Sequence, residues 1–353
     1  MKKFLLAICL SMAVCMVVTP AYALELWDYH LRGVDEGLAA GALPPAGLYF
    51  INDSYFASFV VHGGFDPVKK AYDASQAQSG AKLPGYVDVP ILVWVPGCKF
   101  LNADYAMAIA EPFDFTALRL NSGTAIAAGP FKGLTAWATG DQWGAFNTVL
   151  IPIALSWKCG DWRIKGAFQF GLNDGTSSPN DSMRALAPHT GGSLVGKDGQ
   201  VYAWSSNDNW AFTPNLGISY LHAGWNFSAD FFYTVYTKDS DTQYQNGDEF
   251  AADYTITYTC GKWTFGVGAS QENQIENDKF VGAVPPSKAV FYQSQPNTKA
   301  EQYTMGPIIG YNFGPISLLA TYNWELETKN NVGGNFFLLR MIIPLGNPCF
   351  FGR

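Results

Sequence analysis

The side chains that commonly carry catalysis are scattered along this 353-residue chain and form no recognisable motif. The glycine-rich stretch 191–196 lies inside a polar segment, so it resembles neither a phosphate loop nor a nucleophile elbow. Asp239 and Asp241 begin like a calcium loop, but the glycine at the sixth place and the closing glutamate are missing. The histidines also lie far apart in the sequence, at His30, His62, His189 and His222. We therefore expect no enzyme, no cofactor and no metal site.

A different set of charged residues falls on one parity of segments that alternate in polarity. In residues 226–237, 249–259 and 316–327, every second residue is mostly bulky and apolar, and the residues between are mostly polar or small. A period of two over this length is typical of strands that place one face in an apolar environment. The polar parity carries the residues that we predict to line a lumen or a solute path: Asp230, Glu249, Asp253, Glu325, Glu327 and Arg340.

Two of these residues are expected to meet. If the last hairpin folds about residues 331 and 332, Asn323 faces Arg340 and Glu325 lies diagonal to it. A diagonal neighbour is within reach of a long side chain. Two interpretations stay open, because the pair can brace the wall as an ion pair, can face a solute, or can do both.

The composition indicates which environment the apolar parity faces. Only 14% of the residues are charged, whereas soluble domains carry about 25%. Aromatic residues make up 15%. After the first two dozen residues, no apolar run approaches the roughly 18 residues that a membrane helix needs. A chain that faces lipid without such runs is expected to cross as a β-barrel. The net charge of -7 and the absence of a Lys/Arg cluster argue against a nucleic-acid partner.

The connections between the segments alternate in length. Short turns are expected at 96–101, 159–161, 222–224, 260–262 and 313–315, and longer polar loops at 63–85, 118–146, 174–208, 238–247, 277–299 and 328–334. We therefore predict an all-β fold, a transmembrane antiparallel up-and-down β-barrel of about 12 strands with short periplasmic turns and long extracellular loops. A soluble β-sandwich is the alternative, but it would need charged outer faces. Aromatic residues at the strand ends are expected to form the periplasmic girdle: Trp157, Trp162, Trp225, Tyr258, Trp263 and Tyr311.

The chain divides into four expected parts. Residues 1–23 read as a signal peptide cleaved after Ala23, residues 24–46 as a periplasmic N-terminal segment, 47–346 as the barrel and 347–353 as a tail. This predicts export to the bacterial outer membrane. Whether residues 24–46 plug the barrel stays open, as does the oligomeric state. So does the pairing of the cysteines that remain after cleavage, Cys98, Cys159, Cys260 and Cys349.

Several stretches resemble a known family. Residues 43–50 (LPPAGLYF), 246–250 (NGDEF), 260–268 (CGKWTFGVG) and 333–340 (GGNFFLLR) are similar to segments of the family named for the meta-pathway of phenol degradation. The resemblance implies an outer-membrane barrel that admits hydrophobic or aromatic compounds, and Glu325 and Arg340 match its Glu and basic positions near the C-terminus. Residues 168–175 and the tail 347–353 depart from its pattern.

The function that we expect is therefore a channel or uptake protein for small molecules, with outer-membrane lipids, solutes and the barrel-assembly machinery as partners. The identity of the solute stays open. One alternative is a surface or adhesion protein whose barrel anchors binding loops such as 174–208. A second is an outer-membrane enzyme at the rim, which would need a Ser/His pair with an acid beside it.

Overall fold

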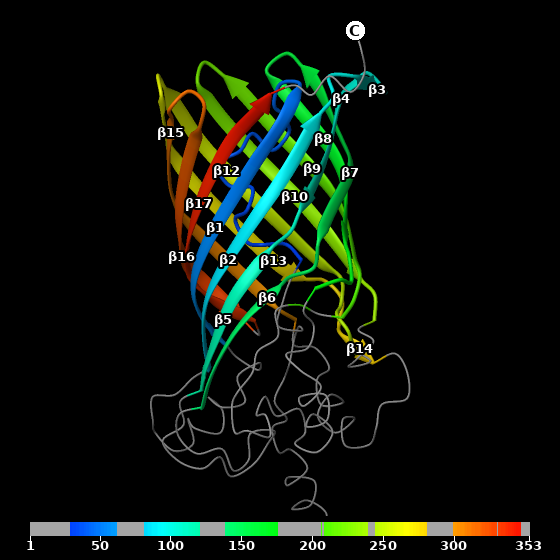
Figure 1. The fold of residues 1–353 in the computed structure, drawn as a ribbon, viewed down its shortest axis with the longest axis vertical. Helices are drawn as coiled ribbons and strands as arrows, with labels where there is room; N and C mark the ends of the chain where they lie inside the picture. The colour runs from blue at the N-terminus through cyan, green and yellow to red at the C-terminus, as the bar shows by residue number, and fades with distance from the viewer. Residues whose placement is uncertain are drawn as a thin grey trace, which may run out of the picture.

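The described residues fold as one large antiparallel β-sheet that closes on itself (Figure 1), with a small two-stranded sheet formed by residues 244–245 and 279–280. The structure, a computed structural model, describes residues 29–61, 81–120, 138–175, 206, 208–238, 244–280, 299–329 and 331–346. Among these residues, no helix is long and apolar enough to cross a membrane.

The described strands are β1 (Gly47–Val61), β2 (Ala81–Val95), β3 (Lys99–Phe100), β4 (Ala103–Ala110), β5 (Phe113–Leu120), β6 (Ala138–Ala145), β7 (Val149–Cys159), β8 (Trp162–Gly171), β9 (Ala211–His222), β10 (Trp225–Tyr236), β11 (Tyr244–Gln245), β12 (Glu249–Cys260), β13 (Trp263–Gln274), β14 (Lys279–Phe280), β15 (Glu301–Asn312), β16 (Ser317–Lys329) and β17 (Val332–Gly346).

Closure comes from β1, which pairs with β2 on one side and with β17 on the other. Two wall strands are interrupted. β4 and β5 are separated at Glu111 and Pro112, and both pair with β2. β6 and β7 are separated at 146–148; β6 pairs with β5, and β7 pairs with β4. With each interrupted pair taken as one strand and the two-residue β3 left out, the described residues form a closed 12-strand barrel, which confirms the predicted fold.

The alternation of side chains follows the predicted parity. On β12, Ile256 is 48% exposed on the outside and Thr257 is 2% exposed on the inside. The outer wall has a polar exception at Asp88 of β2. Its carboxylate accepts hydrogen bonds from Asn52 (2.8 Å), Ser54 (3.1 Å) and Tyr86 (3.1 Å), which offsets the cost of a charge on this face. Large aromatic side chains are exposed beside the short turns, as expected for a girdle: Trp157, Trp162, Trp225, Tyr258 and Trp263.

The predicted register of the last hairpin is wrong. Arg340 of β17 lies opposite Leu319 of β16, and Asn323 lies opposite Phe336. The reason is that β16 runs to Lys329 and β17 already begins at Val332, so Arg340 meets a residue four positions earlier on β16 than the sequence-based register places it.

Residues 29–46 lie inside the barrel and follow its length (Figure 1). Tyr29 packs on Phe146 near the loop end, and Ala46 lies beside Gly97 at the short-turn end. Backbone hydrogen bonds between residues three apart fold the segment into successive turns, and Gly33 and Gly37 adopt the positive φ values that such turns require. Residues 29–46 therefore occupy the lumen, the position that the sequence left open for this segment.

Candidate solute passage

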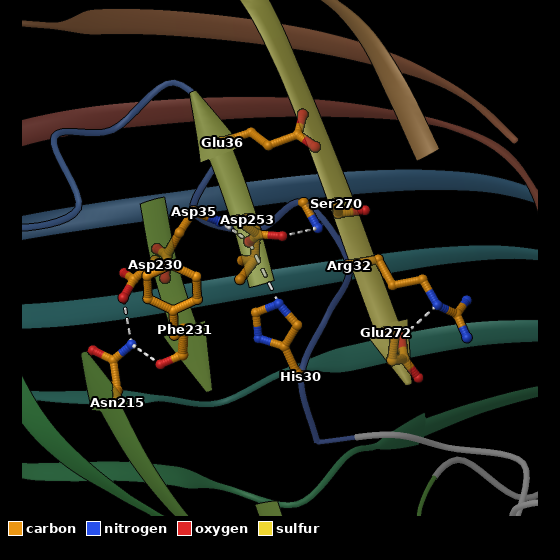
Figure 2. A network of polar contacts seen from close by, with 12 residues as sticks. His30, Arg32, Asp35, Glu36, Asn215, Asp230, Phe231, Asp253, Ser270 and Glu272 are labelled. Atoms are coloured by element: carbon orange, nitrogen blue, oxygen red, sulfur yellow. Dashed lines mark hydrogen bonds and ion pairs between the residues drawn. The ribbon is translucent and has the colours of Figure 1, made fainter. Parts of the chain in front are cut away.

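The N-terminal segment is fixed to one side of the lumen by a carboxylate on β12. Asp253 accepts hydrogen bonds from the backbone N–H of Gly33 (3.1 Å) and of Asp35 (2.9 Å). The imidazole of His30 lies 3.4 Å from the same carboxylate and packs at a tilt against the ring of Phe232 on β10. Figure 2 shows these contacts converging on Asp253. One buried charge thus satisfies several donors of a segment that has no regular structure of its own.

Hydroxyl groups on β12 and β9 hold the remainder of the segment. Thr255 accepts from Gly37 N–H (2.8 Å), and Ser219 accepts from Gly41 N–H (2.8 Å). The segment also approaches the wall closely, because a Cβ atom at Gly217 would lie 2.2 Å from the carbonyl oxygen of Ala40. A glycine at this place on β9 is therefore a packing requirement.

Ion pairs add to this attachment. Arg32 donates to Glu272 of β13 (2.7 Å), and both side chains are nearly fully buried. Arg340 donates to Asp53 of β1 through Nε (2.8 Å) and Nη2 (2.6 Å), and Nη2 also donates to the carbonyl oxygen of Val34. The guanidinium of Arg340 therefore joins the first strand, the last strand and the segment.

The opposite side of the lumen is apolar and leaves space. Between the segment and the wall lies a cavity of about 310 Å³. It extends from Tyr29 and Phe146 near the loop end to Leu43 and Pro44 near the short-turn end. Its wall is made largely of hydrocarbon side chains on β2, β4 and β7, among them Val87, Val89, Ile91, Val93, Ala106, Ala108 and Ile151.

Few polar groups interrupt this lining. Lys165 of β8 reaches the cavity, and its Nζ lies 2.9 Å from the carboxylate of Asp230 on β10. Asp230 also accepts from Asn215 of β9. Arg340 and Asp35 are part of the same lining.

The structure places the residues predicted for the lumen in different surroundings. Asp230, Asp253 and Arg340 are buried around the segment. Glu249 is also buried and accepts from the hydroxyl of Tyr236 (2.5 Å). Glu325 is half-buried, whereas Glu327 is exposed at the loop rim, 2.9 Å from Lys329. The solute-path role of all six stays a prediction.

The expected partnership of Arg340 and Glu325 is wrong, since Arg340 pairs with Asp53. A hairpin register inferred from sequence cannot reveal this partner, because Asp53 belongs to the first strand and meets Arg340 only when the barrel closes. The described cysteines Cys98, Cys159 and Cys260 are free and exposed, and Cys349 lies outside the described residues, as does the expected signal peptide 1–23.

Sequence reasoning missed the contribution of the segment and of the apolar wall. The segment supplies His30, Arg32 and the backbone N–H of Asp35, and the wall supplies their partners. One signal was available on β2, where residues 87, 89, 91 and 93 are apolar and so are residues 92 and 94 on the other face. A strand that is apolar on both faces indicates an apolar environment on both sides.

These observations define the class of the protein: it is an outer-membrane β-barrel with its own N-terminal segment in the lumen. The chain belongs to the family described as "Putative MetA-pathway of phenol degradation", which matches residues 68–341. A search of curated proteins found no match.

Solved structures give further similarities. An outer-membrane channel from Pseudomonas putida F1 is 12% identical, with a TM-score of 0.59 over 88% of this chain and 99% of that chain. The translocator domain of the autotransporter NalP from Neisseria meningitidis is 10% identical, with a TM-score of 0.45 over 86% and 90%. The toluene transporter TbuX from Ralstonia pickettii is 11% identical, with a TM-score of 0.39 over 85% and 90%. The first of these similarities supports the barrel fold.

Proposed function

We propose that this protein admits small apolar solutes, aromatic compounds among them, across the outer membrane. The observation that carries the proposal is the cavity of about 310 Å³ with hydrocarbon lining, which extends along the lumen between the N-terminal segment and β2, β4 and β7. A dry cavity of roughly 150 Å³ lined by Leu, Ile and Phe binds benzene, so a substituted ring fits the space available here. Ligand sites of this volume are commonly apolar with a few placed polar groups.

The family description, which refers to phenol degradation, supports an aromatic solute. The distribution of polarity in the lumen supports an apolar one. The polar side chains of β9, β12 and β13 are used to hold the segment, so the space that is left faces hydrocarbon. Passage needs no chemical step, and we propose transport without catalysis.

Export and assembly complete the proposal. The N-terminal residues 1–23 would be removed after Ala23, and the barrel-assembly machinery would insert the mature chain among outer-membrane lipids. Fractionation of cells that express the protein tests this part. The mature protein should be recovered with the outer membrane and should migrate faster on detergent gels before heating than after it. Recovery in the soluble periplasm would contradict it.

Two neighbouring residues of β4 allow a matched test of the passage. Ala108 lines the cavity, and the next residue, Ile109, is 44% exposed on the outside. Ala108→Trp should fill the cavity and lower the uptake of radiolabelled toluene by at least tenfold in cells with an intact lipopolysaccharide leaflet. Ile109→Trp introduces the same side chain on the lipid face and should leave uptake unchanged. The proposal fails if cells with the wild-type protein take up toluene no faster than cells without it.

A further inference from the structure

The cavity contains a carboxylate that the barrel wall does not neutralise. Asp35 lies on the N-terminal segment, lines the cavity and is partly exposed to it. Its backbone N–H is held by Asp253, so the direction of the residue is fixed by the wall (Figure 2). The Asp35 carboxylate forms no hydrogen bond or ion pair with any described residue.

The cations near Asp35 already have partners. Lys165 and Arg340 are close enough for electrostatic interaction with Asp35. However, Lys165 lies 2.9 Å from Asp230, and Arg340 lies 2.6 Å from Asp53. Each cation is therefore balanced by its own wall carboxylate. Asp35 is left as a hydrogen-bond acceptor in a cavity whose lining is largely apolar.

We propose that Asp35 determines solute specificity by accepting a hydrogen bond from a neutral apolar solute that carries a donor, such as the hydroxyl group of an aromatic ring. This inference rests on the proposed function, since it requires that solutes travel through the cavity.

The chemistry of the lining disfavours other classes of solute relative to a neutral donor. A hydrocarbon of equal size leaves the carboxylate without a donor, and a buried acceptor that is unpaired is costly. An anionic solute meets a like charge at short range. A cationic solute is attracted to Asp35 but has to cross the hydrocarbon lining on both sides, where a charge is poorly solvated. A neutral aromatic solute with a hydroxyl group avoids all three of these costs, because its ring packs on the aliphatic wall while its hydroxyl reaches Asp35.

Three solutes that differ at one substituent test the proposal. p-Cresol carries a hydroxyl group, p-xylene has a methyl group in its place, and 4-methylbenzoate has a carboxylate. Their uptake is measured in cells with an intact lipopolysaccharide leaflet and corrected for cells that lack the protein. The variants are Asp35→Leu and Asp35→Asn. Asp161→Leu serves as the control, because Asp161 is an exposed carboxylate on a short turn.

The wild-type protein and the Asp161→Leu control should favour p-cresol over p-xylene. Asp35→Leu should lower the ratio of p-cresol to p-xylene uptake roughly tenfold, since a hydrogen bond to a charged acceptor is lost. Asp35→Asn keeps an acceptor without the charge. It should lower the ratio less and should increase the entry of 4-methylbenzoate.

An unchanged ratio in Asp35→Leu would overturn the role of Asp35, provided that Ala108→Trp still blocks both solutes. If Ala108→Trp blocks neither solute, the proposed passage itself is wrong. If Asp35→Leu loses heat-modifiable migration and does not assemble, Asp35→Asn decides, and an unchanged entry of 4-methylbenzoate contradicts the proposal.

Discussion

Replacement of Asp253 by leucine should loosen the N-terminal segment inside the barrel. The carboxylate of Asp253 accepts from the N–H groups of Gly33 and Asp35 and lies near His30. Leucine has a similar size but accepts nothing, so two backbone donors lose their partner in a buried place. A hydrogen bond to a charged group contributes about 1.5–3 kcal/mol, so the two together contribute about 3–6 kcal/mol to the attachment of this part of the segment.

A loss of this size changes a local opening equilibrium by about two to four orders of magnitude, at roughly 1.4 kcal/mol per factor of ten. The bonds from Gly37 to Thr255 and from Gly41 to Ser219 remain, as does the pair of Arg32 with Glu272. The segment should therefore open at its centre and stay in the lumen. The barrel wall itself should persist, because its backbone ladder does not depend on this side chain.

Hydrogen exchange measured by mass spectrometry on the purified protein reports this opening directly. Peptides that contain Gly33 and Asp35 should exchange at least a hundredfold faster in Asp253→Leu, and those from β12 should not. Planar-bilayer recordings should show a larger conductance than the wild-type protein. Thr259→Val is the control on the same strand, because Thr259 contacts Thr264 beside the short turn. Equal exchange in Asp253→Leu and in wild-type protein, with the barrel assembled, would refute the assigned anchoring role.

Three further predictions concern the wall. Ile256→Arg places a charge on the lipid face near the middle of β12 and should cost about 2–4 kcal/mol of barrel stability. Tyr258→Arg places the same charge near the rim and should cost about 0–1 kcal/mol. Urea titrations of the folded fraction measure both, and the reverse order would show that the depth of these residues is misassigned. Arg340→Leu leaves Asp53 buried without its cation and should lower barrel stability by about 3–5 kcal/mol. In a double-mutant cycle, the addition of Asp53→Leu should restore part of this stability. Strictly additive losses would contradict the ion pair. In protein with Cys349→Ser, a bulky maleimide should label the turn cysteines only after the outer membrane is permeabilised, and labelling of intact cells would reverse the orientation. These cysteines are Cys98, Cys159 and Cys260.

The wall of the barrel could be predicted from the sequence because its signal is local. Alternation along residues 249–259 determines which side chains face lipid, and each strand can be assessed without knowledge of its neighbours. The parity of Ile256 and Thr257 follows from this alone. The position of a turn is less local in effect, since the change of strand after Lys329 determines every pair between β16 and β17.

The interior could not be predicted in the same way, because its partners are far apart in the sequence. His30 of the segment meets Asp253 of β12, and Arg340 meets Asp53 only through closure of the barrel. The segment 29–46 also lacks an alternating pattern, since its turns depend on glycines at positive φ. The polar inward parity on β12 therefore predicts side chains that line the lumen, but it does not reveal that Asp253 and Thr255 bind the segment.

Different residues of the segment bind the wall and face the cavity, and this explains how a barrel with many inward polar groups acquires an apolar passage. Twelve strands enclose more space than the smallest barrels, whose interiors side chains fill. Here the residues that bind the wall, such as Gly33, Gly37 and Gly41, alternate with residues that face the cavity, such as Val34 and Leu38. The first group donates hydrogen bonds to inward-facing polar side chains of the wall, and the second group completes the hydrocarbon lining of the cavity. Anchoring and solute contact are thus assigned to different residues of one short segment, so substitutions at its cavity-facing positions can change which solutes enter while the attachment to the barrel is preserved.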